Sequence, residues 1–194
     1  MNFSQIEKED LLKAWIAISF AFAIFHVQLN SPEFIMTFII SLITVGMAFL
    51  LHELAHKYVA QRYGCWAEFR ADDKMLVIMV LLAFFSPVLF AAPGAVYIIG
   101  GHINKEKNGK ISLAGPAINI VLALVFFALL FFIQLEGIFF DAVFYGFQIN
   151  SFIALFNMIP FGNFDGEKIL RWNKIIYVAT VFFSGILVVI PQFI

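Results

Sequence analysis

The chain has 194 residues, of which 62% are hydrophobic and 13% are charged, and its formal net charge is −1. Soluble domains are about 45–50% apolar and about 25% charged, so this composition excludes an ordinary soluble protein and predicts an integral membrane protein. The near-neutral charge and the lack of a long basic run give no sign of a nucleic-acid partner, which leaves the lipid bilayer as the expected environment.

Five apolar segments are long enough to cross the hydrocarbon core as helices, which takes about 20 residues each. In chain order they are residues 11–29, 34–61, 111–133, 138–160 and 174–193. We expect no removable signal peptide, because the N-terminus is net acidic and no small-residue cleavage site follows the first apolar segment. The predicted fold is therefore an all-α polytopic membrane protein with a single domain over residues 1–194.

Residues 75–100 form a sixth apolar segment that is too short for two crossings and is interrupted by Pro87 and Pro93. The twelve Lys and Arg residues fall into clusters, and the connections 30–33 and 134–137 contain none of them. All twelve lie on one side of the membrane if the sixth segment enters and returns to the side it left, and the positive-inside rule makes that side cytoplasmic. We expect five full spans plus this re-entrant segment, with a cytoplasmic N-terminus and an external C-terminus.

Two stretches between the second and third predicted spans have features of β-strands. Residues 65–70 alternate apolar and polar side chains, and the β-prone stretch 94–99 follows a short helix expected over about residues 75–90. Backbone at membrane depth must be hydrogen-bonded or line a wet cavity, so the two stretches could pair as a small β element. An ordinary loop at the membrane interface is the alternative.

Residues 52–56 read His-Glu-Leu-Ala-His inside the second predicted span. Two histidines at i and i+4 share one helical face and can bind zinc, and the glutamate between them can act as the general base of a metalloprotease. Ionisable groups inside an apolar helix cost roughly 2–3 kcal/mol or more each unless they are paired or bound. We therefore predict metal ligation by His52 and His56 and a catalytic Glu53; two histidines satisfied only by neighbouring carbonyls are the alternative.

A catalytic zinc site usually takes three protein ligands and leaves a position for water, so a third ligand is needed. Asp165 is the strongest candidate, because it follows the span ending near Pro160 in a stretch where proline and glycine break the helix. The spans that precede His56 and Asp165 run in the same direction, so both residues are expected near the cytoplasmic side at a similar depth. We predict one Zn²⁺ per chain, held by His52, His56 and Asp165.

Three motifs, in this order, resemble the site-2 protease family of intramembrane zinc metalloproteases over about residues 35–170. They are His-Glu-Leu-Ala-His at 52–56, Gly-Pro-Ala-Ile-Asn at 115–119, and Asn-x-x-Pro-x-x-x-x-Asp-Gly at 157–166. Many members of that family carry PDZ or CBS domains, whereas we expect this chain to be a compact member without either.

The resemblance likewise implies His52, His56 and Asp165 as zinc ligands and Glu53 as the general base. It also suggests supporting or substrate-contacting roles for Asn119 and Asn157. For Asn119 the alternative is an interhelical hydrogen bond, and for Asn157 it is a side chain that caps local backbone at a helix end.

The expected activity is intramembrane proteolysis, in which a peptide bond within or near the transmembrane segment of a membrane-protein substrate is hydrolysed. A substrate helix must unwind before its carbonyl groups can be reached, so we expect the substrate to bind in extended form against one of the two predicted strands. A metal-ion transporter or sensor that uses the intramembrane His and Asp side chains is the main alternative. A prenyl-peptide-processing protease would be expected to have a glutamate as third ligand, and the intact Glu53 argues against an inactive relative.

Overall fold

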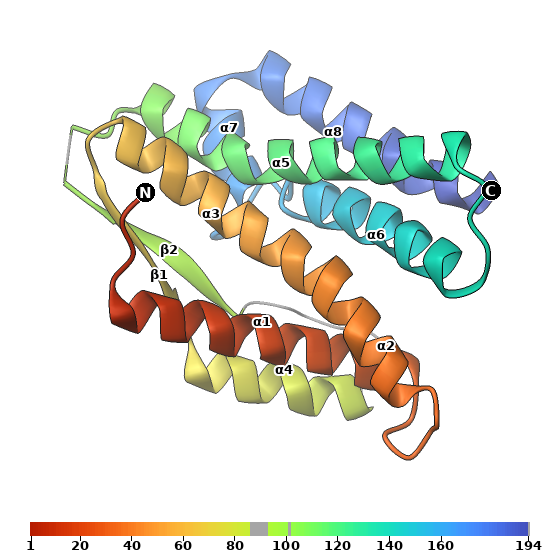
Figure 1. The fold of residues 1–194 in the computed structure, drawn as a ribbon. Coiled ribbons are helices and arrows are strands. Elements are labelled where there is room, and N and C mark those ends of the chain that lie inside the picture. Colours follow the sequence, from red (N-terminus) through yellow and green to blue (C-terminus); the bar gives the residue numbers. More distant parts are fainter. Residues whose placement is uncertain (86–92, 101, 194) are drawn as a thin grey trace.

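The computed structural model describes residues 1–85, 93–100 and 102–193, and helices make up most of it (Figure 1). The α-helices are α1 (Gln5–His26), α2 (Phe34–Ser41), α3 (Met47–Arg62), α4 (Asp73–Phe85), α5 (Lys105–Phe132), α6 (Gly137–Phe156), α7 (Asp165–Trp172) and α8 (Lys174–Val189). A π-helical turn, η1 (Leu42–Gly46), joins α2 to α3, and a 3-10 turn, η2 (Ile190–Phe193), follows α8. The predicted mainly helical fold is confirmed.

Four helical segments among the described residues are long and apolar enough to cross a membrane. They are Phe34–Arg62, Lys105–Phe132, Gly137–Phe156 and Lys174–Phe193, which correspond to four of the predicted spans. The remaining predicted span, residues 11–29, corresponds to α1. This helix starts earlier than expected, at Gln5, and its first turns are charged, so it is not among the four. A fifth crossing and a re-entrant sixth segment stay predictions.

Helix α3 lies between two groups of helices, and this position keeps its ionisable face away from the surface. Figure 1 shows α5, α6, α7 and α8 on one side of it and α1 and α4 on the other, while α2 continues α3 at its N-terminal end through η1. The residues of α3 that become buried include four ionisable ones, His52, Glu53, His56 and Lys57. Burial of such groups requires partners, and the neighbouring helices and strands supply them.

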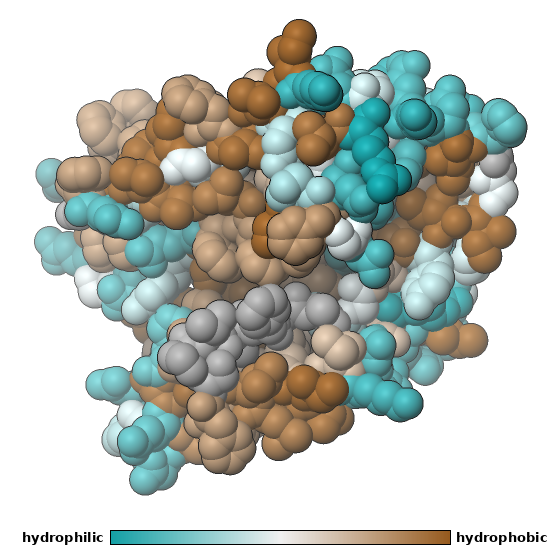
Figure 2. Space-filling model, turned by 180° about the vertical axis from the view of Figure 1, so that it is seen from behind, coloured by the Kyte–Doolittle hydropathy of each residue, from teal (hydrophilic) through white to brown (hydrophobic). Residues whose placement is uncertain are grey.

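The helix ends are sorted by charge. The N-terminal ends of α1, α4 and α5, the C-terminal end of α3, and α7 lie at one end of the molecule, while the connections 27–33 and 133–136 lie at the other (Figure 1). The helices and helix ends at the first end contain the basic residues Lys8, Lys13, Lys57, Arg62, Lys74, Lys105, Lys107, Lys110, Lys168 and Arg171, whereas the two connections at the other end contain no Lys or Arg. Figure 2 shows hydrophobic atoms over much of the middle of one face, with hydrophilic atoms mainly toward its two sides.

The two predicted strands form a small sheet. Strand β1 (Trp66–Ala71) pairs antiparallel with β2 (Gly94–Ile99), with Trp66 opposite Ile99 and Phe69 opposite Val96. The predicted pairing is confirmed and the interface-loop alternative is wrong. The helix expected over residues 75–90 is confirmed as far as Phe85, the end of α4, and the rest of that expectation, with Pro87, lies outside the described residues.

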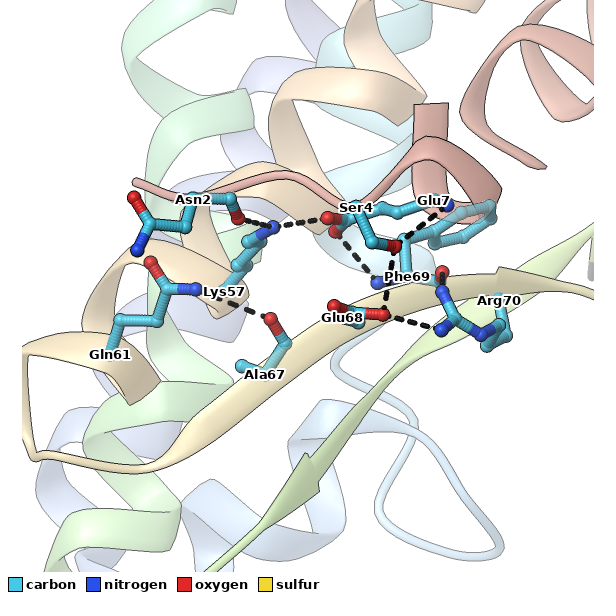
Figure 3. A network of polar contacts seen from close by, with 9 residues as sticks. All are labelled: Asn2, Ser4, Glu7, Lys57, Gln61, Ala67, Glu68, Phe69 and Arg70. Carbon is cyan, nitrogen blue, oxygen red and sulfur yellow. Dashed lines mark hydrogen bonds and ion pairs between the residues drawn. The ribbon is translucent and has the colours of Figure 1, made fainter. Parts of the chain in front are cut away.

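A buried group of polar contacts, which we call the N-terminal polar cluster, connects α1 and β1 to α3 (Figure 3). It consists of Glu7, Lys57, the Asn2 carbonyl and the Phe69 amide. The Lys57 ammonium donates to the Glu7 carboxylate and, at 2.6 Å, to the Asn2 carbonyl oxygen. The Phe69 N–H donates to Glu7 Oε1 at 2.9 Å. Glu7 and Lys57 are both 0% exposed, so the charged start of α1 is a packing element and not a solvated end.

Candidate metal centre

The structure brings together the three side chains that the sequence predicts as metal ligands. His52 and His56 project from one face of α3, and Asp165 is the first residue of α7. Their donor atoms lie within 4.8 Å of one another, and all three residues are buried. Asp165 Oδ2 lies 3.3 Å from His52 Nε2 and 3.1 Å from His56 Nε2.

A sharp return of the chain after α6 places Asp165 at this point. Helix α6 ends at Phe156, and the backbone folds back so that the Gly166 N–H donates to the Asn157 carbonyl at 2.7 Å. A Cβ at position 166 would meet the carbonyl of Met158, so this close approach of backbone to backbone requires glycine. Gly166, one of the residues from which the sequence predicted the helix break, therefore has a direct steric role.

Each histidine is held so that its Nε2 faces the centre. His52 Nδ1 lies 2.6 Å from Asn119 Oδ1, and His56 Nδ1 lies 2.8 Å from the Ile111 carbonyl oxygen. Because carbonyl oxygens can only accept, both Nδ1 atoms carry the proton and both Nε2 atoms present a lone pair. Hydrogen bonding of the second ring nitrogen to a carbonyl is the usual support of a metal-binding histidine.

The space between these donors depends on a glycine in α5. A Cβ at Gly115 would meet the Nε2 atoms of both His52 and His56. Two imidazoles and one carboxylate are a donor set typical of catalytic zinc, which keeps a further position for water. The donor types, their mutual distances and the lack of a Cβ at Gly115 fit a zinc ion.

Glu53 lies beside this donor group, in the same cavity of about 890 Å³ that His52, His56 and Asp165 line. Its Oε2 accepts a hydrogen bond of 3.1 Å from the Val96 N–H of β2. Residues 93–98 line the cavity as well. A carboxylate, the metal donors and one edge of a β-strand therefore meet around a single space.

Asp165 lies outside the four candidate spans, and its ionisation state follows from its surroundings. Burial opposes the charged form, but the imidazoles of His56 and His52 outweigh it when they are protonated at Nε2 in the absence of a metal, and they then hold the pKa of the Asp165 carboxyl below its usual range. The side chain is therefore an anionic ligand at neutral pH.

The two asparagines of the resembling motifs occupy different positions. Asn119 is 0% exposed and contacts His52 directly, and its Nδ2 also donates to the Ala48 carbonyl at 3.2 Å and to Asn150 Oδ1 at 2.9 Å. Asn157 follows the last residue of α6, donates from Nδ2 to the Ile153 carbonyl at 3.0 Å, and lines the cavity. Asn119 thus contacts a ligand and bridges helices, whereas the observed hydrogen bond of Asn157 is local.

Several contributors to the site were absent from the sequence-based predictions. The Ile111 carbonyl and the Val96 N–H are backbone groups, and no side-chain pattern indicates them. Lys168, whose Nζ lies 3.9 Å from Asp165 Oδ1, is one of many basic residues at that end of the chain. Asn150 carried a usable signal, because an amide within a long apolar helix needs a buried partner.

Among curated proteins, the chain is similar to the putative zinc metalloprotease MJ0611 of Methanocaldococcus jannaschii. The two are 46% identical over 177 residues, which cover 91% of this chain and 89% of that protein. The chain belongs to the site-2 protease family. Together with the buried donor group, this membership makes it a zinc metalloprotease whose long apolar helices are typical of membrane proteins.

Other members of the site-2 protease family are more distant. The putative zinc metalloprotease YwhC of Bacillus subtilis is 28% identical over 145 residues, covering 66% of each chain. The zinc metalloprotease MJ0392 of Methanocaldococcus jannaschii is 28% identical over 142 residues, covering 73% of this chain but 35% of that longer protein. No protein-family model and no solved structure matches the chain.

Proposed function

We propose that this site-2 protease is an endopeptidase that hydrolyses a peptide bond within or near the transmembrane segment of a membrane-protein substrate. The observation that carries the proposal is the meeting of three metal donors, a separate carboxylate and a strand edge in one cavity. A metal-binding site alone would need only the donors. Glu53 and the edge of β2 are the parts that hydrolysis of a polypeptide requires.

We assign one zinc ion per chain to His52, His56 and Asp165. When bound, zinc supplies Lewis-acid polarisation of the attacking water and of the scissile carbonyl. The protein holds the two histidines in the ligating tautomer through Asn119 and the Ile111 carbonyl, and it holds Asp165 ionised.

Glu53 is the proposed general base. The hydrogen bond from the Val96 N–H fixes Oε2 of its carboxylate, so we assign the other oxygen to the attacking water. That oxygen takes a proton from the water and later returns it to the nitrogen of the leaving amine. Orientation by a backbone N–H keeps the carboxylate next to the metal donors.

The proposed substrate binds as an extended strand along the free edge of β2. Strand β1 occupies one edge of β2, and the Val96 N–H points away from β1 toward Glu53. Backbone groups of alternate residues share a direction, so the N–H and C=O of Ile98 face the same side as those of Val96. Main-chain pairing there would hold an unwound transmembrane segment beside the metal with little demand on its sequence.

We also propose that the basic end of the molecule is cytoplasmic. The N-terminus would then be inside the cell and the C-terminus outside, with α1 as a fifth span and the metal centre toward the cytoplasmic side. Reporter fusions at the two termini test this orientation. Equal cytoplasmic activity of both fusions would contradict it.

The substitution Glu53→Gln tests the proposed activity. It keeps an acceptor for the Val96 N–H but removes the basic oxygen, so we expect one zinc per chain to remain while cleavage falls by about 10²–10⁴-fold. The measurements are metal analysis of purified protein and cleavage of a reporter carrying a single transmembrane helix. Glu9→Gln, at an exposed glutamate of α1, is the matched control and should change neither. Normal cleavage by Glu53→Gln would overturn the mechanism.

Metal transport is the remaining competitor, because buried His and Asp side chains can also form a transit site. Proteoliposomes containing the wild-type protein separate the two functions. We expect bound zinc and reporter cleavage without a zinc flux. A flux that persists in Glu53→Gln would favour transport.

A further inference from the structure

Asn150 is a buried amide near the middle of α6 that neither binds the metal donors nor lines the cavity. It is 1% exposed, and its Nδ2 donates to the Gly146 carbonyl of its own helix at 2.8 Å. Its Oδ1 accepts the hydrogen bond of 2.9 Å from Asn119 on α5. Asn150 is therefore one contact away from the residue that holds His52.

These bonds determine which end of each amide points where. Because the Asn150 amino group donates to a carbonyl, its oxygen is the atom that faces Asn119. The Asn119 amino group then donates to two acceptors, the Asn150 oxygen and the Ala48 carbonyl. Its oxygen is left facing His52 Nδ1 at 2.6 Å.

We propose that Asn150 is a positioning residue for the metal ligand His52. Together with the Ala48 carbonyl, it keeps the Asn119 oxygen toward the imidazole, so that Nδ1 carries the proton and Nε2 is free to ligate. If the Asn119 amide turned over, its amino group would donate to Nδ1, and the ring proton would move to Nε2, which could no longer bind a metal. The inference rests on the proposed zinc site and adds to it Asn150 of α6, which acts on His52 through Asn119.

His56 provides an internal comparison. Its Nδ1 donates to the backbone carbonyl of Ile111, and a backbone carbonyl in a helix cannot turn over. The Asn119 side chain has two ends of similar shape and opposite polarity, so it needs acceptors that orient its amino group, and these are the Ala48 carbonyl and Asn150 Oδ1. The Asn119 partner of His52 therefore has a further buried amide, Asn150, in contact with it, whereas the Ile111 carbonyl that contacts His56 requires no such residue.

The test is the zinc affinity of purified protein, measured by competition with a chelator. Asn150→Leu removes the acceptor, and we expect zinc affinity to fall by about 10–100-fold, as is usual for groups behind a metal ligand. Ser151→Ala is the matched control, because Ser151 is 0% exposed on the same helix and its hydroxyl bonds the Phe147 carbonyl at 2.8 Å, away from Asn119. We expect that control to bind zinc as the wild type does.

A second background tests the orienting role itself. In Asn119→Asp both terminal atoms of the side chain are oxygens, so an acceptor faces His52 Nδ1 in either orientation. We therefore expect Asn150→Leu to change zinc affinity less than about twofold in that background. An equal loss in both backgrounds would overturn the orienting role and leave only a packing effect.

Thermal unfolding of the zinc-free proteins shows which variants fold. If Asn150→Leu does not fold, Asn150→Ala removes the same acceptor and is measured in the same way. A folded variant at this position with wild-type zinc affinity overturns the inference while the proposed function stands. A wild-type protein that binds no zinc overturns the proposed function itself.

Discussion

Helix α3 takes part in two buried groups of ionisable side chains, and they differ in how their charges are satisfied. In the N-terminal polar cluster, the Lys57 ammonium contacts the Glu7 carboxylate, the Asn2 carbonyl and, at 4.0 Å, the ring of Phe3. Cation and anion meet directly, and the other carboxylate oxygen of Glu7 accepts from the Phe69 N–H. At the metal centre, which includes the preceding residue His56, the nearest lysine ammonium is that of Lys168, at 3.9 Å from the outer oxygen Oδ1 of Asp165.

At the metal centre, the atoms that face one another are all electron-rich. The Nε2 lone pairs of His52 and His56 point at a carboxylate oxygen of Asp165, and this arrangement is favourable only with a proton or a cation among them. An ion pair whose two charges are both satisfied within the protein contributes to the fold, whereas a set of donors that lacks a cation among them is suited to bind a metal ion. We therefore expect substitutions at the metal centre to reduce zinc binding and cleavage, and substitutions in the N-terminal polar cluster to reduce stability.

The largest effect is expected for Asp165→Ala. Loss of one of three ligands should remove nearly all bound zinc and reduce reporter cleavage by more than about 10³-fold, because catalysis by the ion is lost with it. Metal analysis and the cleavage assay measure both effects. Asp141→Ala, at an exposed aspartate of α6, should leave them unchanged. Retention of full zinc content by Asp165→Ala would break the proposed ligand set.

Lys57→Met should act on the fold and not on the chemistry. Removal of one partner leaves Glu7 buried without its cation, which typically costs about 3–5 kcal/mol of stability. We expect a lower thermal unfolding midpoint, with one zinc still bound per folded chain. Lys8→Met, at an exposed lysine of α1, is the control, and adding Glu7→Gln to Lys57→Met should recover part of the loss. An unchanged midpoint would contradict the structural role of the cluster.

Gly115→Ala adds a single methyl group between α5 and the two histidines. We expect the displaced imidazoles to bind zinc about 100-fold more weakly, since ligand positions are tolerated within only about 0.2 Å. Gly185→Ala is a matched helical substitution on α8, where a Cβ would meet nothing within 4 Å. Equal zinc affinity of the two variants would show that the space beside Gly115 is not needed.

The smallest effect is expected at the free edge of β2. Ile98→Pro removes one cavity-facing N–H while the bonds to β1 remain, so we expect kcat/KM for the transmembrane reporter to fall about tenfold, the equivalent of one backbone hydrogen bond. Ile98→Ala separates this from lost packing, because it removes more side chain but keeps the N–H. If the alanine variant loses as much activity as the proline variant, pairing with the edge is not involved.

Much of the metal centre could be derived from sequence because its information is local. The i and i+4 spacing of His52 and His56 defines a shared helical face wherever the helix lies. Asp165 was predicted because it lies in a stretch where proline and glycine break the helix, and the sorting of basic residues predicted the same side of the membrane for it as for His56. The three donors do lie together. The sheet was predictable for the same reason, since alternation and β-propensity are properties of short stretches.

Long-range partners could not be derived in this way. Glu7 stands in a charged run that resembles a solvated helix end, and it is buried because Lys57, fifty positions away, meets it in the folded chain. The Val96 N–H that orients Glu53 has no side-chain signature. Helix positions and ligand types therefore follow from local spacing and transfer energies, whereas the choice of partner for each buried polar group depends on how the helices pack.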